Sequence, residues 1–181
     1  MLKKFSLESS GGSSLAKSSI SKAIRKKVVE QYPELSAEFL EEVFPKKAQV
    51  TVVKGVNHIN IIVVEQRAIF IQTREGTVLP TLRVLHKYPF MMPHMQVDRG
   101  AVKFVLSGSH IMCPGLTSPG GRMVDVPAET PVAIMVEGKE HAIGVGVTKM
   151  STADIRSVNK GIAIELLHEL DDGLWHTTRF D

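Results

Sequence analysis

The chain has 181 residues, of which 43% are hydrophobic and 23% charged, a composition typical of a folded protein with one ample domain or two small ones. No uncharged apolar run approaches the roughly 18 residues of a membrane-spanning helix. The start lacks the apolar segment of a secretory signal, and the single cysteine cannot form an internal disulfide. We therefore expect a cytoplasmic protein without membrane contact.

Positive charge is concentrated in the first half of the chain. Residues 1–91 contain 14 Lys and Arg against 8 Asp and Glu, whereas residues 92–181 contain 8 against 11. A basic half favours a polyanionic partner, because phosphates attract clustered lysines. A solvated surface that only keeps the protein soluble explains the charge equally well.

A mobile arm is predicted for residues 1–19, because residues 6–19 consist mostly of Ser and Gly. A helix should start at Ser18 or Ser19, where serine can act as the N-cap, and end before Pro33. The apolar stripe of this helix consists of Ile20, Ile24 and Val28. Its basic side consists of Lys22, Arg25, Lys26 and Lys27.

The rest of the first half predicts an α/β domain with a small antiparallel sheet over residues 20–91. A second helix is expected over residues 34–44. Short β-branched segments predict a strand meander at residues 49–53, 59–64 and 68–73. A helix is expected over residues 81–88, and the prolines after it favour a domain boundary near residues 89–95. The fold class predicted for the whole chain is α+β.

The second domain, residues 92–181, should be a small closed or half-closed β structure, because short apolar segments alternate with turns about every ten residues. Residues 100–106 can form a helix with Phe104 and Val105 on its apolar face and Lys103 pointing away. Residues 110–115 predict a strand that ends in a turn. Two further strands should meet at Gly138-Lys139, and Ser151 with Asp154 forms a capping box before a short helix.

No arrangement of side chains predicts catalysis or metal binding. His110 precedes Cys113 by three residues, and residues at that spacing in a strand face opposite sides, so we expect a buried, unreactive thiol. The seven histidines are scattered, without a CxxC or HxxxH pair. Residues 144–149 lack the Gly-Lys-Ser/Thr ending of a phosphate loop. The sequence therefore predicts a protein that is not an enzyme and needs no metal or cofactor.

Residues 97–115 suit ligand recognition without chemistry. Glycines at positions 100, 108 and 115 let the backbone approach a ligand, because no Cβ intervenes, and free N–H groups at such corners suit phosphate oxygens. Positive charge beside glycine-bearing segments comes from Lys103, Lys139 and Lys160. The same residues also fit a packed structural corner that binds nothing.

Longer motifs resemble a known family. The segment "VDRGAVKFVLSGSHIMCPGLTSPG", followed by "AIMVEGKEHAIGVG", "VNKGIAIE" and "DGLW", resembles the PUA domain, named for pseudouridine synthases and archaeosine transglycosylases. The segments "FPKKAQV", "PTLRVLHKYPF" and "QVDRGA" extend the likeness, over roughly residues 20–178, to the malignant T-cell amplified sequence protein family. The sequence departs from the family at Ser109-His110, where alanine and a small amide are usual.

The resemblance implies an RNA-binding subunit of a translation factor. Its β-barrel-like PUA domain would face the acceptor end of tRNA, and its N-terminal domain would contact ribosomal RNA. The partner would be a homologue of density-regulated protein, and the pair looks like the two halves of ligatin. The pair would act on the small ribosomal subunit in release of deacylated tRNA, in reinitiation and in non-standard delivery of initiator tRNA.

The resemblance also implies site residues. Those of the PUA domain would be Gly100, Lys103, Ser107, Gly108, Ser109, His110, Pro114, Gly115, Lys139 and Lys160. His110 would add a stacking or pH-sensitive group. A ribosomal RNA surface would form if basic side chains of the first half converge on one face, namely Lys22, Arg25, Lys26, Lys27, Lys46, Lys47, Arg83 and Lys87.

Two other functions compete with this hypothesis. A protein-interaction adaptor whose PUA domain does not engage RNA fits the negative balance of the second half. An RNA-modifying enzyme fits less well, because the remaining residues outside a PUA domain carry no plausible nucleophile.

Overall fold

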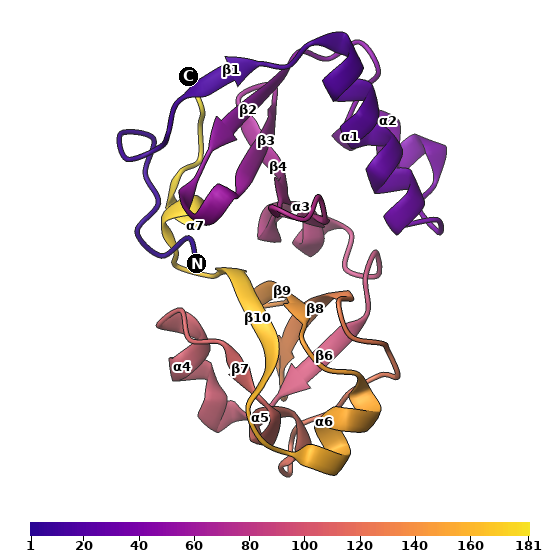
Figure 1. Cartoon of the computed structure of the whole chain (residues 1–181), viewed down its shortest axis with the longest axis vertical. Coiled ribbons are helices and arrows are strands. Elements are labelled where there is room, and N and C mark those ends of the chain that lie inside the picture. The colour runs from indigo at the N-terminus through magenta and orange to yellow at the C-terminus, as the bar shows by residue number, and fades with distance from the viewer.

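The computed structural model describes residues 1–181, and Figure 1 shows two sheets stacked along the long axis of the molecule. The fold is α+β, as predicted, with five strands in each sheet. Helix α3 (Leu82–Lys87) lies between the two sheets, and residues 88–93 lead from it to the second sheet (Figure 1).

The first sheet is antiparallel, with the strand order β1-β2-β3-β4-β5. Its strands are β1 (Ser13–Leu15), β2 (Val50–Lys54), β3 (Asn60–Val64), β4 (Arg67–Gln72) and β5 (Val78–Pro80). The turn between β3 and β4 consists of Glu65 and Gln66, both in left-handed backbone conformations with φ of 49° and 65°. Such a two-residue turn matches the twist of the two strands, so the predicted meander is confirmed.

Helices α1 (Ser18–Gln31) and α2 (Ala37–Val43) lie side by side next to this sheet (Figure 1). Ile24 and Val28 of α1 are buried, as their spacing predicts, whereas Ile20 is exposed. The N-cap of α1 is Lys17 without a side-chain bond, rather than a serine. Helix α2 does have a serine cap, because the Ser36 hydroxyl accepts a hydrogen bond from the Phe39 N–H.

The first residues of the chain are packed against the rest of the protein. Residues 1–19 are predicted to form a mobile arm, but β1 pairs with β2, and the side chains of Leu2 and Phe5 are buried. The Phe5 ring lies 6.3 Å from that of Phe180, between ring centroids. The prediction relied on the Ser and Gly content of residues 6–19 and overlooked Leu2 and Phe5. Burial of these two apolar side chains holds the segment against the protein.

The second sheet is curled and has the strand order β6-β8-β9-β10-β7. Its strands are β6 (His94–Val97), β7 (Ile111–Met112), β8 (Pro131–Val136), β9 (Gly144–Thr148) and β10 (Ile162–Glu169). Strands β6 and β8 are parallel, and the other pairs are antiparallel. This arrangement is the β-barrel-like structure expected for the second half.

Short helices surround the second sheet. They are the 3₁₀ turn η2 (Arg99–Ala101), α4 (Val102–Leu106), α5 (Cys113–Thr117) and α6 (Thr152–Val158). Helix α7 (Gly173–His176) lies instead beside the first sheet (Figure 1), where the Gly173 N–H donates to the Leu2 carbonyl. Of the strand and turn predicted at residues 110–115, the strand is present as β7, but the turn is not. Helix α5 begins there at Cys113, with Pro114 in its first turn. The predicted cap of α6 is present, since the Ser151 hydroxyl accepts a hydrogen bond from the Asp154 N–H.

One hydrophobic core reaches across both sheets. It joins residues such as Phe70 of the first sheet to Val145 and Leu167 of the second. The end of the chain strengthens the joint, because Phe180 is buried and its N–H donates to the Gln66 carbonyl at 2.9 Å. No helix of the protein combines the length and hydrophobicity that crossing a membrane requires.

Candidate functional site

A groove of about 770 Å³ lies in the second domain, between the η2–α4 segment on one side and the β7–α5 segment on the other. Three large apolar side chains line it while staying exposed to solvent: Phe104 (55% exposed), Met112 (49%) and Ile162 (42%). A cluster of exposed apolar side chains usually marks a binding surface, whereas single exposed apolar side chains are common and need no explanation. We call this site the PUA groove.

Hydrogen bonds to Asp98 connect the two sides of the PUA groove. One carboxylate oxygen of Asp98 accepts from the Ala101 N–H at 3.1 Å, at the start of the helical wall. The other accepts from the Ser118 hydroxyl at 2.6 Å, just beyond α5. Both oxygens of Asp98 are thus used to shape the groove.

The structure brings together five of the ten predicted site residues of the second domain. Those that line the PUA groove are Gly100, Ser109, His110, Pro114 and Gly115. A Cβ at Gly115 would lie 3.8 Å from the Ala101 Cβ and 3.9 Å from Ile111, which are ordinary contacts. The absence of a side chain at Gly115 therefore leaves open groove rather than relieving a clash.

His110 directly precedes β7 and is held in one orientation. The Leu166 N–H donates to Nδ1 of His110 at 3.0 Å. Leu166 lies two residues beyond Ile164, the last residue of β10 that pairs with β7. The imidazole therefore accepts a hydrogen bond from the next part of β10 just before β7 begins.

Two other predicted residues lie close to the PUA groove without lining it. The ammonium of Lys103 is 5.1 Å from the centroid of the Phe104 ring, so its positive charge lies at the rim. The Ser107 hydroxyl donates to the Phe104 carbonyl at 2.7 Å and closes the end of α4.

The remaining three predicted residues lie elsewhere. Gly108 has φ of 90°, and a Cβ there would lie 3.3 Å from a carboxylate oxygen of Glu169, so this glycine faces the domain joint. Lys139 is in the turn between β8 and β9, and Lys160 precedes β10. Both lysines are exposed, and neither lines the groove.

Cys113 and His110 do not form a nucleophile–base pair. The Cys113 thiol is buried and donates to the Lys160 carbonyl at 3.5 Å, and burial raises the pKa of the thiol. Nδ1 of His110 is occupied by the Leu166 N–H. No group of three or more His, Cys, Asp or Glu side chains is placed to hold a metal ion.

A second groove, of about 710 Å³, lies between α1 and α2. Four of the eight predicted basic residues converge on it, namely Lys22, Arg25, Lys26 and Lys46. Its base is apolar, with Leu40 and Phe44 buried beneath the cations. Arg25 is 3.4 Å from Glu41, so one of the four charges is balanced within the chain. We call this site the basic groove.

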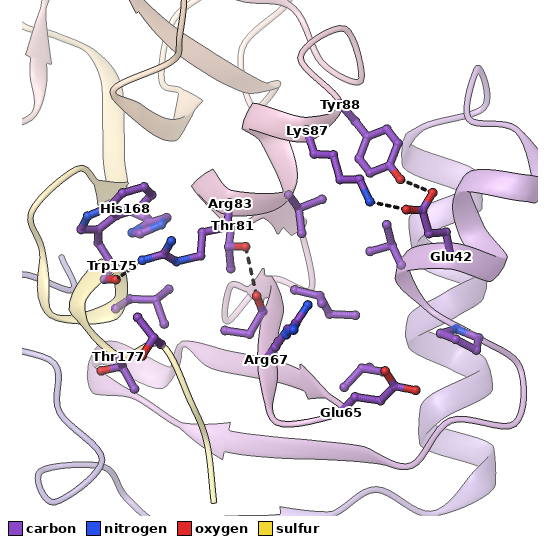
Figure 2. A pocket seen from close by; sticks show the side chains of 18 residues that line it. Glu42, Glu65, Arg67, Thr81, Arg83, Lys87, Tyr88, His168, Trp175 and Thr177 are labelled. Carbon is purple, nitrogen blue, oxygen red and sulfur yellow. Dashed lines mark hydrogen bonds and ion pairs between the residues drawn. The ribbon is translucent and has the colours of Figure 1, made fainter.

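Arg83 and Lys87 lie instead in a cleft of about 580 Å³ between the two domains, shown in Figure 2. The Arg83 guanidinium lies 4.1 Å from the centroid of the Trp175 indole and donates to the Trp175 carbonyl at 2.9 Å. Lys87 pairs with Glu42, which raises the pKa of the ammonium and lowers that of the carboxyl. Both cations already have partners within the chain.

The two remaining basic residues, Lys27 and Lys47, line neither the basic groove nor the interdomain cleft. The predicted basic surface is therefore divided. Four residues share one groove, two contribute to the domain joint, and two are isolated on the surface.

Comparison with known proteins assigns both domains. A Pre-PUA-like domain matches residues 3–89, and a PUA domain matches residues 93–170. Malignant T-cell-amplified sequence 1-B of Xenopus laevis is 54% identical over 160 residues, which cover 88% of each chain. Malignant T-cell-amplified sequence 2 of Homo sapiens is 50% identical over 177 residues, or 97% of each chain. The chain belongs to the malignant T-cell-amplified sequence family.

Solved structures of lower identity share the fold of this family member. A hypothetical protein from Pyrococcus horikoshii OT3 superposes with a TM-score of 0.70 at 22% identity, covering 92% of this chain and 99% of that one. A PUA domain protein from Aeropyrum pernix K1 gives 0.64 at 20% identity, covering 91% and 89%. Both likenesses extend across the Pre-PUA-like and PUA domains.

Sequence reasoning missed what makes the PUA groove of this family member apolar. It placed Phe104 on the apolar face of a helix, yet Phe104, Met112 and Ile162 are all exposed in the groove. Helix α4 has only five residues, so spacing alone could not decide which apolar side chains face inward. Phe104 next to Lys103 was a weak signal of an exposed aromatic side chain.

Proposed function

We propose that this member of the malignant T-cell-amplified sequence family is an RNA-binding subunit of a translation factor that acts on the small ribosomal subunit. The PUA groove takes the acceptor end of tRNA, and the basic groove contacts ribosomal RNA. The observation that carries the proposal is the set of exposed apolar side chains in the PUA groove.

The PUA groove has the properties that unstacked bases require. Bases of single-stranded RNA bind by stacking on aromatic and apolar side chains, and Phe104 offers such a face. Lys103 places positive charge beside the same ring, where a phosphate that follows the stacked base can pair with it. Gly100 and Gly115 leave the backbone accessible on both sides.

The basic groove supports the contact with ribosomal RNA. Lys22, Lys26 and Lys46 extend over an apolar base, and of these three only Lys26 has an acidic partner, Glu30, at 3.8 Å. An exposed pair at that distance on one helix is weak and leaves the lysine able to exchange partners. Several cations on one groove attract a phosphate backbone.

The steps and the partner follow from the family resemblance. The chain acts in the cytoplasm as a heterodimer with a homologue of density-regulated protein. The pair releases deacylated tRNA after termination, supports reinitiation and delivers initiator tRNA by a non-standard route. None of these three steps requires catalysis, a metal or a cofactor from this chain.

The test is binding of purified small subunits and of deacylated tRNA at about 50 mM and 200 mM salt, with and without the partner. Three or four phosphate contacts predict a fall in affinity of roughly 40- to 150-fold between the two salt concentrations. Binding should tighten when the partner is present. A flat salt response, or no binding to either RNA, would contradict the proposal.

A protein-interaction adaptor is the second candidate, and the interdomain cleft favours it. Arg67 lines the cleft and makes no ion pair, and the same cleft contains Arg83 packed on the Trp175 ring (Figure 2). Aromatic and arginine side chains are enriched where proteins bind one another. Partner binding that weakens on Arg67→Glu, in a chain that binds neither RNA at low salt, would establish this function instead.

A further inference from the structure

The most specific polar group in the PUA groove belongs to His110. Its Nδ1 accepts a hydrogen bond from the Leu166 N–H at 3.0 Å. A backbone amide can only donate, so Nδ1 carries no proton, and the proton of the neutral ring must be on Nε2. This hydrogen bond from β10 therefore fixes the tautomer of the imidazole as well as its orientation.

Nε2 of His110 makes no hydrogen bond within the chain, although the imidazole lines the PUA groove. The other polar side chains there are committed differently. Asp98 and Ser118 bond to each other, and the Ser109 hydroxyl lies 3.4 Å from that of Ser107. The groove thus combines apolar side chains with a donor whose position is set by the fold.

We propose that the Nε2–H of His110 donates a hydrogen bond to a ring nitrogen or carbonyl oxygen of an unpaired nucleobase that stacks in the PUA groove. This inference rests on the proposed RNA-binding function and names the chemical group that the groove recognises. A base has an apolar face for Phe104 and an acceptor on its edge for His110, whereas an abasic sugar-phosphate offers neither. If Nδ1 carried a proton, its N–H would face the Leu166 N–H, and the hydrogen bond between His110 and Leu166 could not form.

One variant separates the roles of the two ring nitrogens of His110. In His110→Asn, the amide oxygen occupies nearly the place of Nδ1 and can accept from the Leu166 N–H, but no donor reaches the place of Nε2. The fold should therefore be kept while the contact with the base is lost. In His110→Phe the ring shape remains, but both nitrogens are removed.

The experiment measures binding of the full chain to an RNA acceptor-stem minihelix with a single-stranded CCA end. A second minihelix has an abasic nucleotide at its 3′ end. We expect His110→Asn to melt at the wild-type temperature, to bind the CCA minihelix about 3- to 10-fold more weakly, and to bind the abasic one as the wild type does. A donor restored with His110→Gln should recover part of the loss.

Two failures can be told apart with Phe104→Ala as the reference. If Phe104→Ala weakens CCA binding and His110→Asn does not, then His110 is only a structural anchor and this inference is wrong, while the proposed function stands. If the wild type binds neither minihelix, then the PUA groove does not take the acceptor end, and the proposed function and the inference both fail. Equal weakening of both minihelices by His110→Asn would also overturn the inference, because contact with a base would not explain it.

Discussion

The PUA groove and the basic groove are similar in volume but offer opposite kinds of contact. In the PUA groove, three large apolar side chains are exposed, the His110 donor is fixed by a hydrogen bond from β10, and the nearest lysine is at the rim. In the basic groove, Leu40 and Phe44 form a buried base, Val29 is the one large apolar side chain that stays exposed, and lysines on long flexible stems surround the opening. The first geometry suits recognition of a base, and the second suits attraction of a phosphate backbone.

The comparison teaches that net charge is a poor guide to where RNA binds in this protein. The second half has a negative balance, yet it contains the groove with the most specific features. Base stacking and hydrogen bonding need few charges, whereas backbone attraction needs several. A negative domain and an RNA-binding groove are therefore compatible.

The largest effect is expected from the basic groove. Replacement of Lys22, Lys26 and Lys46 together by glutamine should weaken small-subunit binding roughly 100-fold at low salt and reduce the slope of log affinity against log salt by about 2 to 3. Binding of the CCA minihelix should not change. Lys27→Gln with Lys47→Gln is the control, because these residues line neither groove. An equal loss for each charge removed would show that only overall charge matters.

A smaller effect is expected from the PUA groove, where a substitution should change the affinity for RNA but not its salt dependence. Phe104→Ala should weaken minihelix binding about 5- to 100-fold, because stacking of one base contributes about 1–3 kcal/mol. The salt slope should stay the same, since no charge is removed. The side chain is more than half exposed, so the melting temperature should change little. A reduced slope at unchanged low-salt affinity would contradict this assignment.

The least change in binding is expected at the joint beneath the two grooves, where Glu169 ends β10. Its carboxylate is buried, and neither oxygen has a hydrogen-bond partner. Burial, followed by the nearby Asp172, raises the pKa of Glu169 to about 7, against the opposing charges of the N-terminus and Lys3. The folded protein therefore holds a proton between about pH 4.5 and pH 7 that the unfolded chain has lost.

Stability should accordingly fall as pH rises through this window and stay low above it. Glu169→Gln should remove this part of the pH dependence and raise the free energy of unfolding at pH 8 by about 1–3 kcal/mol, because a buried charge without a partner is replaced by a neutral amide. Urea unfolding at pH 5 and pH 8 measures both effects. Affinity for either RNA should change less than about 2-fold, because mutations at distant, independent sites have nearly additive effects. An identical pH profile in the variant would show that Glu169 is solvated.

Much of the architecture could be predicted from the sequence. The spacing of Ile24 and Val28 placed the buried face of α1, and the β-branched segments placed the first meander. These features depend on local hydrophobic periodicity, which can be recognised without knowledge of the tertiary structure. The long motifs around residues 97–120 were specific enough to indicate the family, and the relatives confirmed it.

Prediction failed where the outcome depended on distant partners. Leu2 and Phe5 stand near a Ser- and Gly-rich segment, and only the approach of Phe180 and Gly173 from the other end of the chain gives them a place to be buried. Arg83 matched a basic surface in sequence, but Trp175, 92 residues later, draws it into the domain joint.

The sequence by itself determined the α+β class, the family and the glycine corners around the PUA groove, because these follow from local patterns of residue types. Only the tertiary structure decided which of the lysines converge and which apolar side chains stay exposed. It also decided that His110 points one nitrogen at Leu166 and leaves the other for the groove. The reason is physical: a side chain's environment is set by segments that meet after folding, and a hydrogen bond between residues 56 positions apart leaves no local trace in the chain.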